Sequence, residues 1–173
     1  MKTNRRHQCL WGIVAICFGL SCGVSAADPL LTAIKNNDLA KVKELVAANP
    51  DCAKREIEYN SHPLTLAIDN FKPEIIKFLI EQGADVNAMD NRGNSPILNF
   101  AKLEGGYWTN LDQLKQVLQM LCDKKVDLNK YDKNGKSPLY ILALKIHFQN
   151  TLANKLAIMQ MMIDHGASVK TMQ

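Results

Sequence analysis

The sequence predicts an all-α solenoid of about four helix-turn-helix repeats with hairpin fingers, preceded by a signal peptide. Three observations predict it: four prolines recur at separations of 34, 33 and 42 residues, apolar residues follow them at three- and four-residue spacing, and turn formers separate the units. The prolines are Pro29, Pro63, Pro96 and Pro138. A period in the thirties is typical of stacked supersecondary units, each too small to bury its apolar face alone.

Each proline is expected to begin the first helix of its unit. Proline at the first helical position gives up only an N–H that has no partner. Asp28, Ser95 and Ser137 precede three of these prolines and are expected to cap the next free donors. Apolar residues in the second unit have the spacing of two amphipathic helices: Leu64, Ala67, Ile68, Ile75, Ile76, Leu79 and Ile80. Gly83 is expected to end the second of them.

The turns between units are the next recurring element. Asp-Asn-Arg-Gly at 90–93 and Asp-Lys-Asn-Gly at 132–135 favour tight turns, so each junction should project as a finger. With the Gly-Ala-Asp-Val-Asn segment at 83–87, these units resemble the ankyrin repeat nearly position for position. The histidine that this family usually carries two residues after the proline is absent, and other residues replace it: Leu31, Thr65, Leu98 and Tyr140.

The predicted domain organisation follows from these repeats. Residues 1–27 are the signal peptide and residues 28–173 the repeat domain. The repeats span about 28–56, 57–89, 90–131 and 132–173, and the first is the most divergent.

The leader has the features of a secretory signal peptide. Three cations within the first six residues precede an uncharged apolar run over 10–20, and small residues allow cleavage after Ala26 or Ala27. An uncleaved membrane anchor and a lipid on Cys22 are the alternatives. We expect the chain to be exported across the inner membrane of a Gram-negative bacterium and to be periplasmic or secreted.

The charge balance argues against a nucleic-acid partner, and the cysteine positions argue against a disulfide. The net charge of +4 includes three leader cations, so 18 cations face 17 anions in the remaining chain, a balance of +1 that does not imply nucleic acid. No membrane association is expected after cleavage. Cys52 and Cys122 fall at core positions two stacking steps apart, so we expect buried thiols and no disulfide between them.

No pattern of an enzyme, cofactor or metal site stands out. His62, His147 and His165 are scattered over the repeats, and no glycine-rich phosphate loop occurs. Acidic and amide residues have a calcium-like spacing, which finger turns explain: Asp85, Asn87, Asp90, Asp127, Asn129 and Asp132. Three methionines are interpreted as core filler rather than copper ligands: Met159, Met161 and Met162.

Units three and four carry nine and eight extra residues at the corner between their helices. In a structural interpretation the extra residues lengthen the second helices, and Thr109 and Asp112 form a capping box. Tyr107 and Trp108 then pack across the junction as a hydrophobic staple. In a functional interpretation Tyr107, Trp108 and Phe148 anchor a partner. The structural interpretation is favoured, because paired insertions can satisfy each other.

Two further surfaces are candidates for binding. The predicted outward finger positions run from acidic to basic along the stack, which would orient a partner. They are Glu58, Tyr59, Asn91, Arg92, Lys133 and Lys136. Ile141 and Leu144 lie on a first helix that is apolar nearly all round, so one apolar edge is expected to be exposed for a partner or a second copy.

The function expected from this resemblance is protein binding. Exported proteins of similar layout include immunity proteins, which neutralise a cognate toxin, and periplasmic scaffolds. We expect a periplasmic or extracellular protein partner, with inhibition of a toxin as the first interpretation. A scaffold or stress-protective envelope protein is the alternative, and an enzyme is the last one considered.

Overall fold

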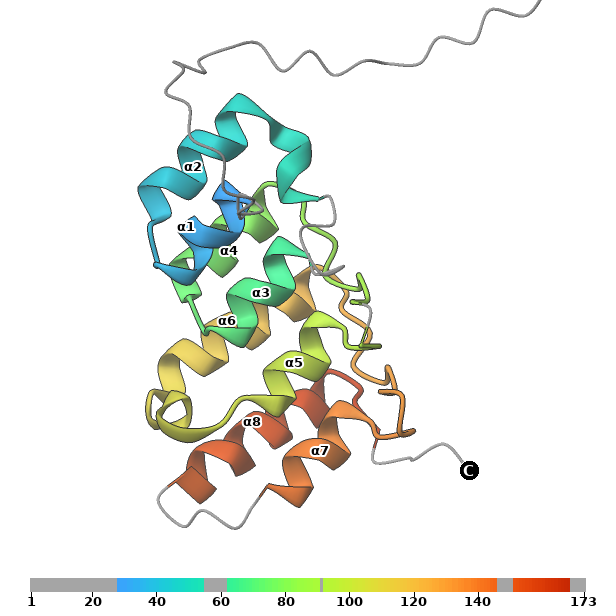
Figure 1. Ribbon diagram of the computed structural model, residues 1–173. Coiled ribbons are helices and arrows are strands. Elements are labelled where there is room, and N and C mark those ends of the chain that lie inside the picture. Colours follow the sequence, from blue (N-terminus) through green and yellow to red (C-terminus); the bar gives the residue numbers. More distant parts are fainter. Residues whose placement is uncertain (1–27, 55–61, 91, 146–150, 169–173) are drawn as a thin grey trace, which may run out of the picture.

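The chain folds as a stack of helix pairs, described over residues 28–54, 62–90, 92–145 and 151–168 in a computed structural model (Figure 1). The elements in chain order are α1 (Pro29–Lys35), α2 (Leu39–Ala48), η1 (Pro50–Ala53), α3 (Pro63–Asp69), α4 (Pro73–Glu81), α5 (Pro96–Lys102), η3 (Gly105–Thr109), α6 (Leu111–Asp123), α7 (Pro138–Leu144) and α8 (Leu152–Asp164). Within the described ranges no residue lies in a strand. The all-α prediction is confirmed for these ranges.

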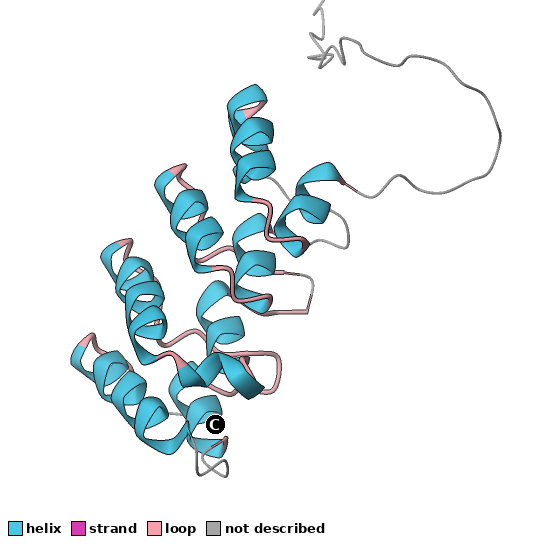
Figure 2. Ribbon diagram, turned by 90° about the vertical axis from the view of Figure 1, so that its left-hand side faces the viewer, coloured by secondary structure: helices cyan, strands magenta, loops and turns pink. Residues whose placement is uncertain are grey.

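The helices form two layers (Figure 2). The first helices contact one another in the order α1, α3, α5, α7, and the second helices in the order α2, α4, α6, α8. Within three of the units the first helix packs against the second helix: α1 on α2, α3 on α4 and α7 on α8. This nearest-neighbour pattern is that of a solenoid.

All four repeat prolines begin a helix, as predicted. The Asp28 carboxylate accepts from Leu30 N at 2.9 Å, and the Ser137 hydroxyl accepts from Tyr140 N at 3.2 Å. The predicted cap at Ser95 is wrong. Its hydroxyl is buried and makes no hydrogen bond with any described residue, so α5 begins on Pro96 without a side-chain cap.

One continuous core joins the units. Ile34, Ile68, Leu98 and Leu139 are fully buried along the layer of first helices, and the second helices add further buried aliphatic residues. Because each unit buries its apolar face only against its neighbours, the stack is one cooperative body rather than separate helix pairs.

The second helix of unit two ends as its sequence predicts. Gly83 has φ +83°, in the left-handed region that glycine adopts at low cost, and Ala84 N donates to Leu79 O at 3.0 Å. The turn therefore reverses the chain towards the finger.

The finger tips are tight turns built on aspartates. Asp90 Oδ1 accepts from Arg92 N at 2.9 Å and Asn94 N at 2.8 Å, while Asp132 Oδ1 accepts from Asn134 N and Lys136 N in the same way. These carboxylates accept from backbone N–H groups, so the turn interpretation is confirmed for Asp90 and Asp132. The described residues contain no cluster of three or more His, Cys, Asp or Glu that could hold a metal ion.

Two asparagines tie successive units together. Asn87 accepts from Asp127 N at 2.7 Å and donates to Lys125 O at 3.3 Å. Asn129 repeats this one unit later, accepting from Ser168 N at 2.7 Å and donating to Gly166 O. Each amide therefore fixes the spacing between the turns of neighbouring units.

The cysteine prediction is partly confirmed. Cys52 is buried, and Cys122, near the C-terminal end of α6, is only half-buried. No disulfide joins them. Desolvation, with a contribution from Asp123, raises the pKa of the Cys122 thiol. Among the helices that the structure describes, none has the length and apolarity to cross a membrane.

Candidate functional site

The exposed side of the first helices and the adjoining fingers form one continuous surface, which we call the inner face. The sixth residue after each repeat proline lies on the inner face, and its type differs from unit to unit. These positions are Lys35, Asp69, Lys102 and Leu144. The four residues differ in charge and polarity, so the repeat pattern does not fix the residue type in this row.

Lys102 connects the inner face to two fingers. Its ammonium group donates to Asn94 Oδ1 in its own finger and lies 3.5 Å from Asp132 Oδ2 in the next finger. Desolvation pushes the pKa of Asp132 upward, but the backbone N–H groups of Lys136 and Asn134 and the Lys102 charge outweigh it, so the pKa is lowered. The two fingers are therefore held in place by ionic and backbone contacts before any partner arrives.

The predicted finger positions have mixed outcomes. Arg92 and Lys133 are exposed, as expected, and Lys136 is half-buried. A Cβ added to Gly93 would lie 3.8 Å from the Cβ of Lys133, so successive fingers lie against each other. The remaining predicted positions lie outside the described residues: Glu58, Tyr59 and Asn91.

Asp69 is an unusual carboxylate on this face. Its side chain is exposed to solvent on one side, and it accepts no hydrogen bond and forms no ion pair within the described ranges. Desolvation and the nearby Asp90 carboxylate raise its pKa to about 6, against opposing contributions from Arg92 and Lys102. The carboxylate is thus less well stabilised here than in water.

The extra residues of units three and four lengthen the second helices, as the structural interpretation predicted. α6 and α8 have 13 residues each, against 9 in α4. The predicted capping box of Thr109 and Asp112 is wrong. The N-cap of α6 is Asn110, whose Oδ1 accepts from Gln113 N at 3.1 Å, while the Thr109 hydroxyl donates to Gly106 O at 2.6 Å.

Trp108 is part of the core rather than a surface anchor. It is 1% exposed, its Nε1 donates to Leu103 O at 2.8 Å, and its ring meets Phe100 edge-on at 6.2 Å. The functional interpretation of Trp108 is therefore wrong. The indole packs beside Phe100 at the corner that the insertion forms. Phe148 lies outside the described residues.

Tyr107 has the opposite placement. It is 41% exposed, and its ring lies 5.6 Å from that of Phe71, in the turn between α3 and α4. The insertion of unit three thus reaches back over unit two, and the Tyr107 ring borders the inner face.

Three charged residues join the insertion to unit four. Lys145 donates to Lys102 O at 2.7 Å and to Glu104 Oε1 at 2.8 Å, and this hydrogen bond lowers the pKa of Glu104. Lys155 is 3% exposed, donates to Lys145 O and lies 5.6 Å from the Trp108 ring centroid. Desolvation, and then the charge of Lys145, lower the pKa of Lys155. A cavity of about 630 Å³ adjoins this network.

The predicted apolar edge is only half correct. Leu144 is 46% exposed, but Ile141 is 5% exposed. Ile141 lies on the side of α7 that faces the packed helices, so the expected two-residue patch reduces to Leu144 in the described part of the chain.

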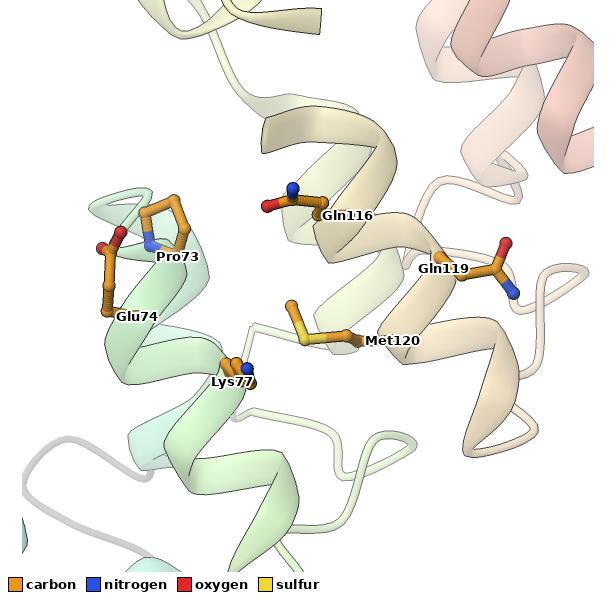
Figure 3. A pocket seen from close by; sticks show the side chains of 6 residues that line it. All are labelled: Pro73, Glu74, Lys77, Gln116, Gln119 and Met120. Carbon is orange, nitrogen blue, oxygen red and sulfur yellow. The ribbon is translucent and has the colours of Figure 1, made fainter. Parts of the chain in front are cut away.

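A second depression lies on the other layer, between α4 and α6 (Figure 3). Its volume is about 530 Å³, and in the view Met120 points from α6 towards α4, between Lys77 and Gln116. Pro73, Glu74 and Gln119 complete its lining. The charged and amide side chains of the described lining are exposed to solvent, so none of them is a buried polar group that would select a ligand.

Asn99 was not singled out by sequence reasoning. It follows Pro96 by three residues, where units two and four carry Leu66 and Ile141. An amide where units two and four carry aliphatic residues was the signal that could have found it.

Comparison with known proteins agrees with this architecture. Residues 13–90 match the family model described as ankyrin repeats (3 copies). The chain is 38% identical over 68 residues to a putative ankyrin repeat protein of Rickettsia bellii (strain RML369-C); these residues are 38% of this chain and 10% of that protein. Residues 13–90 are therefore similar to ankyrin repeats, and helix pairs continue beyond the matched segment.

Proposed function

We propose that this chain is an exported protein-binding module that contacts a periplasmic or extracellular protein partner through its inner face. The observation that carries the proposal is the fixed geometry of the fingers: Asp90 and Asp132 hold their tips, and Lys102 spans two of them. Arg92 and Lys133 remain exposed on this frame. A surface ordered in advance loses little conformational entropy on binding.

Inhibition of a cognate toxin is the first role proposed for the complex, and a scaffold or stress-protective role is the alternative. The identity of the captured partner and its neighbouring gene separate these roles. A secreted toxin encoded next to this gene supports the first, and a redox enzyme there supports the second.

Reversing the finger charges is expected to weaken binding without unfolding the protein. In Arg92→Glu with Lys133→Glu, both side chains are exposed, so the melting temperature should stay within a few degrees. Charges at the rim of an interface act mainly on the association rate, so capture from periplasmic extract should become slower and weaker. The matched control is Lys115→Glu with Lys124→Glu on α6 and its C-cap, two exposed positions of the other layer. Equal capture by both double variants would contradict an inner-face site.

Export is expected to remove the leader after Ala26 or Ala27. The small residues there follow the apolar run, as a signal peptidase requires. Mass spectrometry of the protein purified from the extracytoplasmic fraction measures the new N-terminus. An intact leader, or a lipid on Cys22, would contradict a soluble periplasmic protein.

A further inference from the structure

The inner face contains a small cavity where α3, α5 and η3 meet. Its volume is about 300 Å³, and Asp69, Asn99, Lys102, Leu103, Glu104 and Tyr107 line it. It opens between units two and three, beside the fingers that the proposed function assigns to the partner. The cavity therefore lies within reach of a chain segment bound along the inner face.

Asn99 gives the cavity a buried donor. The side chain is 4% exposed, and its Nδ2 makes no hydrogen bond with any described residue. A buried amide without a partner destabilises a folded protein. Leu66 and Ile141 at the matching positions show that stacking of the units does not need an amide there. The amide is best explained by a ligand that accepts its hydrogen bond.

Asp69 gives the same cavity an acceptor. Its carboxylate has no hydrogen-bond donor in the described ranges, and desolvation and the Asp90 charge raise its pKa to about 6. The other two charged groups of the lining already have partners: Lys102 is held by Asn94 and Asp132, and Glu104 by Lys145. The cavity thus has one buried donor and one acceptor to offer a ligand.

The charges of the lining favour a neutral ligand. A cation in the cavity would approach Lys102 and leave the Asn99 donor without an acceptor. A carboxylate would approach Asp69 and Glu104. A carboxamide carries both an acceptor oxygen for Asn99 and N–H donors for Asp69. Leu103 and the Tyr107 ring offer an apolar wall for the methylene groups behind it.

We propose that this cavity binds the side-chain carboxamide of a glutamine or asparagine in the partner segment that lies on the inner face. The oxygen accepts from Asn99 Nδ2, and the amide N–H groups donate to the Asp69 carboxylate. This inference rests on the proposed function, since it places a residue of that partner. Its test uses a small probe, so it can fail while capture of the partner succeeds.

The probe is N-acetyl-glutamine amide, titrated into ¹⁵N-labelled protein produced from the full chain. The side-chain NH₂ resonances of Asn99, assigned by their loss in Asn99→Leu, should shift in a saturable way, with a Kd on the order of millimolar for so small a ligand. N-acetyl-glutamate amide has the same shape and should give no saturable shift. N-acetyl-alanine amide carries only main-chain amides and should also give none. Binding of the alanine probe as tight as that of the glutamine probe would overturn the side-chain assignment.

Two variants separate a ligand site from a structural role. Asn99→Leu should raise the melting temperature while abolishing the probe-induced shift at the Tyr107 backbone amide, because leucine already occupies this position in unit two. Asp69→Ala should lower the probe affinity about tenfold or more, as loss of a charged acceptor does. Lys115→Ala, on α6 in the other layer, should leave the probe affinity unchanged.

Three further results would overturn the inference. They are the absence of a saturable Asn99 shift up to the solubility of the glutamine probe, a lower melting temperature for Asn99→Leu, and a stronger response to N-acetyl-arginine amide than to the glutamine probe. The last result would make this a cation site.

Discussion

Ala67→Asp is expected to unfold the stack. Ala67 is fully buried in α3, a helix that packs on α1, α4 and α5. A carboxylate there would have neither water nor a counter-charge, so we expect a loss of ~4 kcal/mol or more in the free energy of unfolding. Domains of this kind have only about 5–15 kcal/mol in total, and circular dichroism should show lost helicity or a greatly lowered melting temperature.

Ala153→Asp is the matched control for this substitution. Ala153 is exposed in the first turn of α8, where a negative charge interacts favourably with the helix dipole. Its melting temperature should change little. A native melting curve for Ala67→Asp would contradict the packing of α3 between its neighbours.

Trp108→Ala is expected to have the second largest effect. The substitution empties the space beside Phe100, removes the donor to Leu103 O and removes the ring beneath the Lys155 ammonium group. Truncation of a buried tryptophan costs about 3–5 kcal/mol, which urea denaturation measures directly. The loss should loosen the corner between units three and four, since η3 contacts α8.

Two further variants test the reason for that effect. Trp108→Phe keeps a ring but leaves Leu103 O without its donor, so we expect a smaller loss of about 1–3 kcal/mol. Tyr107→Ala removes a half-exposed ring and should cost less than Trp108→Ala. If Trp108→Ala weakened partner capture with unchanged stability, the indole would be a binding residue and its burial in the core would be contradicted.

The parts of the fold set by local chemistry were predictable from the sequence. Proline at a first helical position and Gly83 at a helix end act within a few residues, so their sequence spacing predicts where helices begin and end. The capping box at Thr109 failed because Asn110, a residue further on, caps α6 instead. The predicted cap at Ser95 was wrong because the Ser95 hydroxyl is buried and makes no hydrogen bond with any described residue. Where two adjacent polar residues could each cap a helix, their residue types alone do not show which of them does.

Site residues were harder to predict because their burial depends on the next unit. Trp108 and Ile141 are apolar residues that suit either a surface anchor or a core, and contacts across units place both in the core. Asn99 and Asp69 line the same cavity only because α3 and α5 lie side by side. A single sequence shows the periodicity of the units, but not which unusual residues meet between them.

Photo-crosslinking in the living cell tests the central claim, that the inner face binds a protein partner. A photoreactive amino acid replaces Lys133 on a finger in one strain and Gln119, beside the groove on the other layer, in a second strain; both positions are exposed. After irradiation we expect a discrete adduct of one partner protein from position 133 and none from position 119. An adduct from position 119 with none from position 133 would contradict the claim and place the partner on the layer of second helices.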